Sequence, residues 1–177
     1  MLPQLTLVTG GAACGKSAFA EALAEAQHPV RLYIATAQAH DGEMKAKIAA
    51  HRTRRGAGWE TIEAPLDLAP ALGRVAPGRV VLVDCATMWL SNRAERRHDV
   101  GPAFEDLLEA LRNCAAPVIM VTNELGQGVV PNNAMARAFR QTHGEMNQHL
   151  AAEAGLVVAV MAGLPLVLKG RLPEGGQ

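Results

Sequence analysis

The sequence lacks an excess of charge of either sign, and this absence narrows the range of partners. Lysine and arginine together number 17, and aspartate and glutamate together also number 17. A chain without net charge has no overall field that would draw it onto nucleic acid or an anionic membrane. We therefore expect small-molecule partners and no binding of nucleic acid.

Paired cysteines and long apolar runs are also missing. Cys14, Cys85 and Cys114 are an odd number, and none forms the C-x-x-C pair typical of a metal or redox site. No apolar run approaches the length of a membrane helix, about 18 residues. The first residues, MLPQLTLV, are too few and too uncharged for a signal peptide. These absences predict a soluble, cytoplasmic protein with no membrane span.

The chain instead contains short apolar runs that alternate with helix-like stretches. Nearly continuous apolar runs are typical of strands buried on both faces of a parallel sheet. They are Leu5 to Thr9, Arg31 to Ala35, Val80 to Asp84, Val118 to Thr122 and Leu156 to Ala162. The helix-like stretches are Lys16 to Ala26, Asp41 to Arg54, Pro102 to Cys114 and Asn133 to Ala154. A further strand (Trp59 to Glu63), a short helix (Asp67 to Val75) and a loose tail (Pro173 to Gln177) complete the prediction. Residues 1–177 are thus expected to form one α/β domain, a mostly parallel sheet flanked by helices.

The segment GGAACGKS, residues 10–17, matches the phosphate-binding pattern G-x-x-x-x-G-K-[ST]. It follows a predicted strand and opens a predicted helix, which is the structural context that this motif requires. Glycine permits a backbone nest whose N–H groups converge on a phosphate, with Lys16 reaching the β and γ oxygens and the Ser17 hydroxyl binding Mg²⁺. The segment therefore predicts a nucleotide site.

Asp84 ends a predicted strand and is the second element of this site. Ligands of open α/β sheets bind at the carboxyl ends of the strands, so the carboxylate is expected to help hold Mg²⁺ together with Ser17. A helix cap for the following segment ATMWLSN is the alternative, and the two roles are compatible.

His51 lies at the end of a predicted helix and is followed by Arg52, Arg54 and Arg55. A neutral imidazole can attack phosphorus, and guanidinium groups can hold phosphates and offset charge in the transition state. The arginines lower the imidazole pKa, whereas the helix end raises it, so the sequence leaves the protonation state open. A solvated helix end is the alternative.

A third polar cluster begins at the end of the strand Val118 to Thr122. Thr122, Asn123 and Glu124 are expected to face substrate there, and Asn132 or Asn133 to cap the long helix that follows. Arg137 and Arg140 are suited to a phosphate, to a neighbouring subunit or to a solvated helix face. The remaining histidines, His28, His40, His98, His143 and His149, show no metal-ligand spacing and are interpreted as surface or packing residues, with His40 the possible exception because it follows the second strand.

Taken together, these clusters resemble the bifunctional adenosylcobinamide kinase/adenosylcobinamide-phosphate guanylyltransferase family of cobalamin biosynthesis. The resemblance covers nearly the whole chain and depends on an ordered set of segments. They are LVTGGAACGKS, YIATAQAHDGEM with the helix that ends in His51 and Arg52, WETIEAP, VLVDCATMWLSN, TNELGQGVVP, FRQTHGEMNQHLA and GLPLVLK.

This resemblance implies a RecA-like P-loop NTPase fold, a homotrimer and two successive reactions. The first transfers the γ-phosphate of ATP or GTP to the aminopropanol hydroxyl of adenosylcobinamide. In the second, His51 takes GMP from GTP and passes it to adenosylcobinamide phosphate. The implied nucleotide contacts are Gly11, Ala12, Ala13, Cys14, Gly15, Lys16, Ser17, Ala18, Ala35, Thr36, Ala37, Arg52, Thr53, Arg54, Arg55, Glu63 and Asp84.

Four positions depart from the pattern of that family. Ala13 and Cys14 stand where arginine and serine are common, Gly56 where proline is common, and Asp84 where some relatives carry glutamate. None of these changes removes a group that the chemistry requires. Two other classes remain as alternatives: a simple P-loop kinase that moves only the γ-phosphate, and a nucleotide-driven switch or assembly ATPase.

Overall fold

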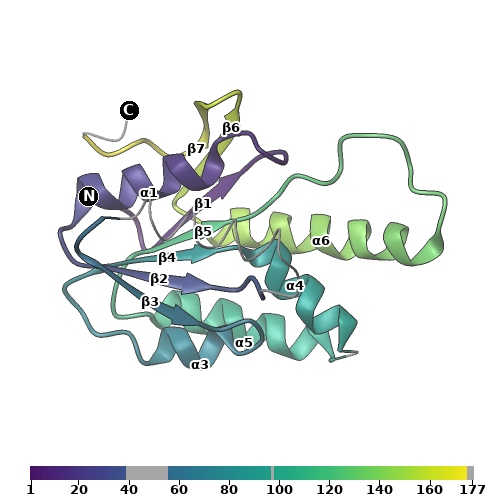
Figure 1. The fold of residues 1–177 in the computed structure, drawn as a ribbon, viewed down its shortest axis with the longest axis horizontal. Helices are drawn as coiled ribbons and strands as arrows, with labels where there is room; N and C mark the ends of the chain where they lie inside the picture. Colours follow the sequence, from purple (N-terminus) through teal and green to yellow (C-terminus); the bar gives the residue numbers. More distant parts are fainter. Residues whose placement is uncertain (39–55, 97, 175–177) are drawn as a thin grey trace.

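The computed structural model describes residues 1–38, 56–96 and 98–174. Within these residues seven strands form one sheet in the order β3-β2-β4-β5-β1-β6-β7 (Figure 1). The strands are β1 (Leu5–Thr9), β2 (Arg31–Ala35), β3 (Trp59–Glu63), β4 (Val80–Asp84), β5 (Val118–Val121), β6 (Leu156–Met161) and β7 (Leu164–Lys169). All neighbouring strands pair in parallel except β6 and β7, which are antiparallel.

Four of the five described helices match helix-like stretches predicted from the sequence, and the helix at residues 86–95 was not among those stretches. The helices are α1 (Lys16–Gln27), α3 (Leu68–Gly73), α4 (Ala86–Glu95), α5 (Val100–Asn113) and α6 (Ala134–Glu153). Asn133 caps α6 as predicted, since its side chain accepts a hydrogen bond from Ala136 N–H at 2.7 Å. The helix predicted over residues 41–54 lies outside the described residues. No helix in the described ranges is long and apolar enough to cross a membrane.

The helices cover both faces of the sheet, α1 on one side and α3, α5 and α6 on the other (Figure 1). Each face has its own apolar core because consecutive strand residues point to opposite sides. Val8, Leu82 and Val158 pack with Leu23 of α1 on the first face. On the second face a larger cluster of strand leucines and isoleucines packs against α3 to α6, and Trp89 is its largest fully buried member. Burial on both faces explains why the strands are nearly continuous apolar runs.

The last strand was missed by the sequence-based prediction. The segment Leu164–Lys169 forms β7, which pairs with β6 through a turn at Ala162 and Gly163. Both turn residues have positive φ, 51° and 80°, as a two-residue turn between twisted antiparallel strands requires. The usual sequence signal for such a turn is Asn-Gly or Asp-Gly. Here alanine occupies the first turn position, at Ala162, so the sequence did not predict the hairpin.

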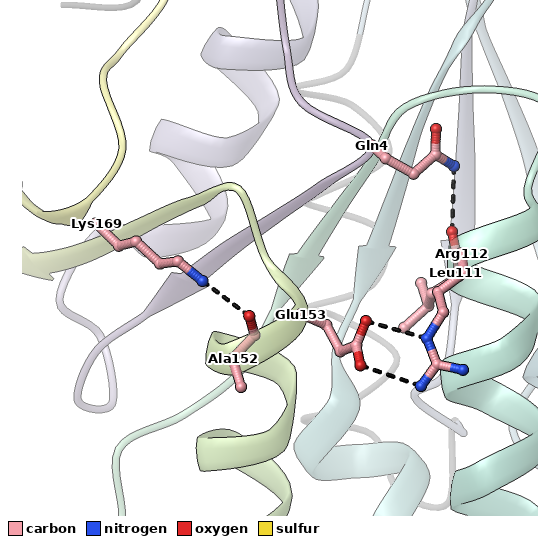
Figure 2. Close-up of polar contacts among 6 residues, drawn as sticks. All are labelled: Gln4, Leu111, Arg112, Ala152, Glu153 and Lys169. Atoms are coloured by element: carbon pink, nitrogen blue, oxygen red, sulfur yellow. Dashed lines mark hydrogen bonds and ion pairs between the residues drawn. The ribbon is translucent and has the colours of Figure 1, made fainter.

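Polar contacts join the elements at the amino end of the sheet (Figure 2). Gln4 donates to the Leu111 carbonyl of α5 at 3.1 Å, and Lys169 donates to the last carbonyls of α6 at 2.8 and 3.0 Å. Arg112 and Glu153 form a two-bond ion pair, 3.0 Å in each bond, between α5 and α6. This pair raises the pKa of Arg112 and lowers that of Glu153. These contacts all lie at the amino end of the sheet, whereas ligands of open α/β sheets bind at the carboxyl end.

Candidate active site

The strand register brings the predicted site residues to one edge of the sheet. Glu63 pairs with Ala35, Ala35 with Asp84, and Asp84 with Val121, so the carboxyl ends of β3, β2, β4 and β5 are level. Val121 in turn pairs with Val8, next to the start of the phosphate-binding loop. The edge therefore carries Glu63 at one end, Asp84 in the middle and the loop beside it.

Two glycines give the loop its shape. A Cβ atom on Gly10 would lie 2.5 Å from the Val160 carbonyl oxygen and 2.6 Å from Cys14 Sγ, so no side chain fits. Gly15 has φ 97°, a conformation that favours glycine, and a Cβ there would lie 3.1 Å from Gly163 Cα. Cys14, half-buried with its Sγ close to Gly10, belongs to the packing of the loop. The glycines thus allow the loop to lie directly against the β6–β7 hairpin.

Hydrogen bonds from outside the loop orient its peptide groups. Glu124 N–H donates to the Gly10 carbonyl at 2.9 Å, and Gly163 N–H donates to the Cys14 carbonyl at 2.8 Å. The C=O and N–H of a trans peptide point in opposite directions. Fixing these carbonyls therefore aims the N–H of Gly11 away from Glu124, and the N–H of Gly15 away from the hairpin turn. In the described part of the chain, no N–H of residues 11–15 donates to another backbone carbonyl, so this row of donors is available to an anion.

Lys16 lies across the loop. Its side chain is largely buried, 9% exposed, and its ammonium donates to the Gly11 carbonyl at 2.9 Å. Ala12, Ala13 and Ala18 are exposed around it. The ammonium is therefore held at the mouth of the nest, where a phosphate bound by the backbone N–H groups would meet it.

Ser17 and Asp84 are suited to a magnesium ion. Both are half-buried, and no other described residue forms a hydrogen bond with either side chain that would compete with a metal. Their hydroxyl and carboxylate oxygens are the ligand type that Mg²⁺ prefers, with the remaining positions left to phosphates and waters. Asp84 does not cap the next helix, because Cys85 holds the cap position of α4 and no side chain caps it. The cap interpretation was therefore wrong.

Cys85 follows Asp84 in the chain and is buried. Burial raises the pKa of the Cys85 thiol to about 12, with a further increase from the negative charge of Asp84 and a decrease from the positive charge of Lys16. The thiol stays protonated and takes no part as a nucleophile or metal ligand.

Thr36, one of the implied nucleotide contacts, is engaged by the protein. It is fully buried, and its hydroxyl donates to the Cys85 carbonyl at 2.8 Å and accepts from Cys85 N–H at 2.6 Å. Its own carbonyl accepts from the Asn92 side chain at 2.8 Å. Thr36 thus fixes the chain next to Asp84. Ala37, which is half-buried, is the neighbour with more access to a ligand.

Glu63 borders an open cleft of about 730 Å³ between β3 and α3. The side chain is exposed, and Arg79, Arg74 and Asp67 also line the cleft. Arg79 is paired with Glu60 at 2.8 Å, whereas the carboxylate of Glu63 forms no hydrogen bond or ion pair within the described residues. A carboxylate at this position can accept hydrogen bonds from a ligand.

The segment after β5 is held in place by α6. Arg140 donates to the Gly126 carbonyl and, at 3.4 Å, to the Val129 carbonyl, and Arg137 donates to the Pro131 carbonyl at 3.0 Å. Arg137 is exposed and Arg140 is half-buried, so the phosphate, subunit and solvated-face roles considered for them stay predictions. Both arginines bind the main chain of the long loop between β5 and α6, which protrudes beyond the sheet (Figure 1).

His143 is the titratable residue whose role the sequence least revealed. It is 1% exposed, and its Nε2 lies 2.9 Å from Thr87 Oγ1. Burial lowers its pKa below the usual 6.5, a shift partly opposed by the charge of Glu124. The packing interpretation was correct, but the residue is also part of a buried hydrogen-bond network.

This pKa shift predicts a dependence of stability on pH. The folded-state pKa of His143 is lower than the unfolded one, so the unfolded chain binds the proton more readily. The contribution is fully present above about pH 6.5 and is lost as the pH falls, by at most about 1.4 kcal/mol per pH unit. Urea unfolding between about pH 7.5 and 5.5 should give a shallower slope for His143→Gln than for the wild type. Equal slopes would contradict the assignment.

The predicted nucleophile and its arginines, residues 51–55, lie outside the described residues. Their roles stay predictions, and so does the exception made for His40. The structure joins the phosphate-binding loop, Asp84 and Glu63 at one edge, and adds contacts from Glu124 and Gly163 that sequence reasoning did not identify as supports of the loop.

Comparison with known families decides between the remaining classes of nucleotide-binding protein. A family model described as cobinamide kinase / cobinamide phosphate guanyltransferase matches residues 6–168. The chain belongs to this family. The bifunctional adenosylcobalamin biosynthesis protein CobP of Pseudomonas aeruginosa is 44% identical over 167 residues, covering 93% of this chain and 96% of the relative. CobU of Salmonella typhimurium is 38% identical over 181 residues, with 93% and 99% covered.

Solved structures support the fold of this family member more broadly. The RadB recombinase superposes with a TM-score of 0.54 at 18% identity, covering 98% of this chain and 85% of that one. An ATPase from a type III secretion system superposes with a TM-score of 0.55 at 11% identity, covering 94% and 57%. At these identities the likeness concerns the fold alone. It agrees with the predicted α/β fold, a mostly parallel sheet flanked by helices.

Proposed function

We propose that this protein phosphorylates adenosylcobinamide with ATP or GTP and then transfers GMP from GTP to adenosylcobinamide phosphate, giving adenosylcobinamide-GDP. The observation that carries the proposal is the phosphate-binding nest beside Asp84 in a chain of the cobinamide kinase / cobinamide phosphate guanyltransferase family. The edge of the sheet supplies positioning and charge, which is most of what phosphoryl transfer requires of a protein.

In the kinase step the nest binds the β-phosphate and Lys16 neutralises the β and γ oxygens. The acceptor hydroxyl attacks the γ-phosphorus as its proton leaves, and the bond from the γ-phosphorus to the bridging oxygen breaks. Ser17 and Asp84 would hold Mg²⁺, which supplies charge compensation on the phosphate oxygens. Fixed N–H groups and an ammonium held at 2.9 Å from the Gly11 carbonyl need little rearrangement to act on such a substrate.

In the guanylyl step we assign the nucleophile to His51. A neutral ring nitrogen attacks the α-phosphorus, a P–N bond forms, and the bond to the β-phosphate oxygen breaks to release pyrophosphate. A phosphate oxygen of adenosylcobinamide phosphate then attacks the same phosphorus and releases the histidine. Arg52, Arg54 and Arg55 are suited to hold the phosphates during both displacements.

Glu63 is proposed to select the guanine base. Its carboxylate is exposed at the edge of the 730 Å³ cleft, level with Ala35 and Asp84. Guanine presents two adjacent N–H donors, N1–H and the exocyclic amine, to which one carboxylate is complementary, whereas adenine presents no such pair. The cleft has enough volume for a purine.

The homotrimer and the cytoplasmic location are part of the same proposal. Val129 and Val130 are exposed on the loop before α6. Met135, at the start of α6, is also exposed and lines an apolar groove of about 430 Å³ between α4 and α6. Such surface supports contact with a neighbouring subunit. A sedimentation measurement of molecular mass tests this part.

The decisive experiment uses GTP labelled at the α-phosphate. After incubation with Mg²⁺ and denaturation, the wild-type chain is expected to retain label that is labile to acid and stable to alkali, while γ-labelled GTP leaves none. His51→Ala should retain no label. His98→Ala, which changes an exposed histidine, should label like the wild type. No label in the wild type, with γ-phosphate still transferred to adenosylcobinamide, would identify a simple P-loop kinase.

A further inference from the structure

A buried polar network lies behind the phosphate-binding loop and has no part in the chemistry described above. Its side chains are Thr87 of α4, Thr122 after β5, and His143 and Asn147 of α6. Three of them are almost completely buried, with exposures of 6% for Thr87, 0% for Thr122 and 1% for His143. Buried polar groups persist only where their hydrogen bonds are satisfied, so the arrangement of donors and acceptors is informative.

The hydrogen bonds connect these side chains to one another and to the main chain of Asn123. Asn123 N–H donates to Thr87 Oγ1 at 2.8 Å, and the same oxygen lies within hydrogen-bond distance of His143 Nε2, at 2.9 Å. The Thr122 hydroxyl donates to Asn147 Oδ1 at 2.8 Å, and Asn147 Nδ2 donates to the Asn123 carbonyl at 3.0 Å. Burial lowers the pKa of His143 and so favours its neutral form within this network.

The network fixes both main-chain groups of Asn123. Its N–H is bound by Thr87 and its carbonyl by Asn147. The next residue, Glu124, donates its N–H to the Gly10 carbonyl, and this contact sets the direction of the Gly11 N–H. An unbroken chain of hydrogen bonds and peptide planes therefore leads from α6 to the first donor of the phosphate nest.

We propose that His143 and Asn147 are positioning residues that hold the Asn123–Glu124 peptide against Gly10 and so keep the nest in the geometry needed for phosphoryl transfer. The inference rests on the proposed kinase step. His143 acts through Thr87, whereas Asn147 acts on the Asn123 carbonyl directly. Loss of either side chain should loosen the Asn123–Glu124 peptide against Gly10. The nest would then hold the phosphates less precisely, and the alignment of the γ-phosphate would be disturbed.

Three variants separate positioning from simple loss of stability. His143→Phe keeps a planar ring and removes the hydrogen bond at Nε2, whereas His143→Gln retains a side-chain amide that can either donate or accept a hydrogen bond. Asn147→Ala removes both bonds to the segment after β5. Gln148→Ala changes the exposed neighbour of Asn147 and serves as the control. For each, kcat and KM of the kinase reaction, nucleotide affinity, thermal stability and hydrogen exchange of the amides of residues 11–15 and 123–124 are measured.

His143→Phe and Asn147→Ala are expected to lower kcat about 10- to 100-fold with a smaller change in KM for the corrinoid, because small misplacements of a reacting group are costly. Amide exchange should become faster in residues 11–15 and 123–124, and His143→Gln should restore most of kcat. Wild-type kcat and exchange in His143→Phe and Asn147→Ala would overturn the inference. The inference would also be overturned if kcat of His143→Phe fell only in proportion to its thermal stability and His143→Gln did not restore kcat. If the wild type itself lacked kinase activity the proposed function would fail, while nucleotide affinity and amide exchange would still decide the inference.

Discussion

Lys16→Ala is expected to lower kcat of the kinase reaction by about 100- to 1000-fold, the usual result of removing a group that stabilises charge in the transition state. The ammonium is held 2.9 Å from the Gly11 carbonyl at the mouth of the nest, so the positive charge needs little rearrangement to meet the β and γ oxygens. Formation of the GMP adduct should fall as well, because the same charge would stabilise the departing pyrophosphate. Steady-state phosphoryl transfer and single-turnover labelling measure the two effects separately.

The control for this substitution is Arg171→Ala, which removes an exposed positive charge near the end of the chain. It should leave both rates unchanged. A normal rate of GMP-adduct formation in Lys16→Ala, combined with loss of kinase activity, would show that GTP in the second reaction places its triphosphate elsewhere. Normal rates of both reactions would remove the phosphate-binding loop from the mechanism.

Gly10→Ala is expected to have the second largest effect, on stability and nucleotide binding together. The new Cβ would lie 2.5 Å from the Val160 carbonyl oxygen, which is backbone and cannot rotate away. Relieving the clash requires β1 and β6 to separate or the loop to shift. We expect a loss of about 2–3 kcal/mol in the free energy of unfolding, typical of overpacking, and a weakening of nucleotide affinity of at least about tenfold.

The adjacent glycine provides a matched comparison. A Cβ on Gly11 would meet nothing within 4 Å, so Gly11→Ala should unfold at nearly the wild-type urea concentration in the absence of nucleotide. Equal destabilisation by the two substitutions would show that the cost does not come from contact with the Val160 carbonyl, since reduced backbone freedom by itself stabilises a protein. It would also contradict the close approach between the loop and β6.

The fold was largely predictable because local pattern and buried environment agree in most elements. Strands such as Val80–Asp84 are buried on both faces, so their apolar runs have sharp limits, and α5 begins two residues before its predicted start. β7 was not predictable in this way. Its residues are mostly exposed, and its turn carries Ala162 where a stronger turn residue is usual. A strand that is fixed by its pairing and its turn, and not by burial, has no clear pattern of apolar residues in the sequence.

The site was predictable where the chemistry needs a fixed spacing in sequence, and less so where contacts come from distant elements. GGAACGKS and the acid at the end of β4 have such spacing and position. The support of the loop by Glu124 N–H and Gly163 N–H is made by the backbone, so no residue type marks it. His143 is separated from Thr87 by 56 residues, and its burial follows from the packing of α6, which a single sequence does not specify.

The contact between the phosphate-binding loop and the β6–β7 turn has a consequence for biosynthesis of the chain. The nest is encoded within the first 17 residues, yet the Cys14 carbonyl is oriented by the N–H of Gly163. During synthesis, the hydrogen bond from Gly163 N–H to the Cys14 carbonyl cannot form until almost the whole polypeptide has left the ribosome. Nascent chains that stop before residue 163 should therefore fail to recognise nucleotide, and a cell would not commit ATP or GTP to unfinished copies of the enzyme.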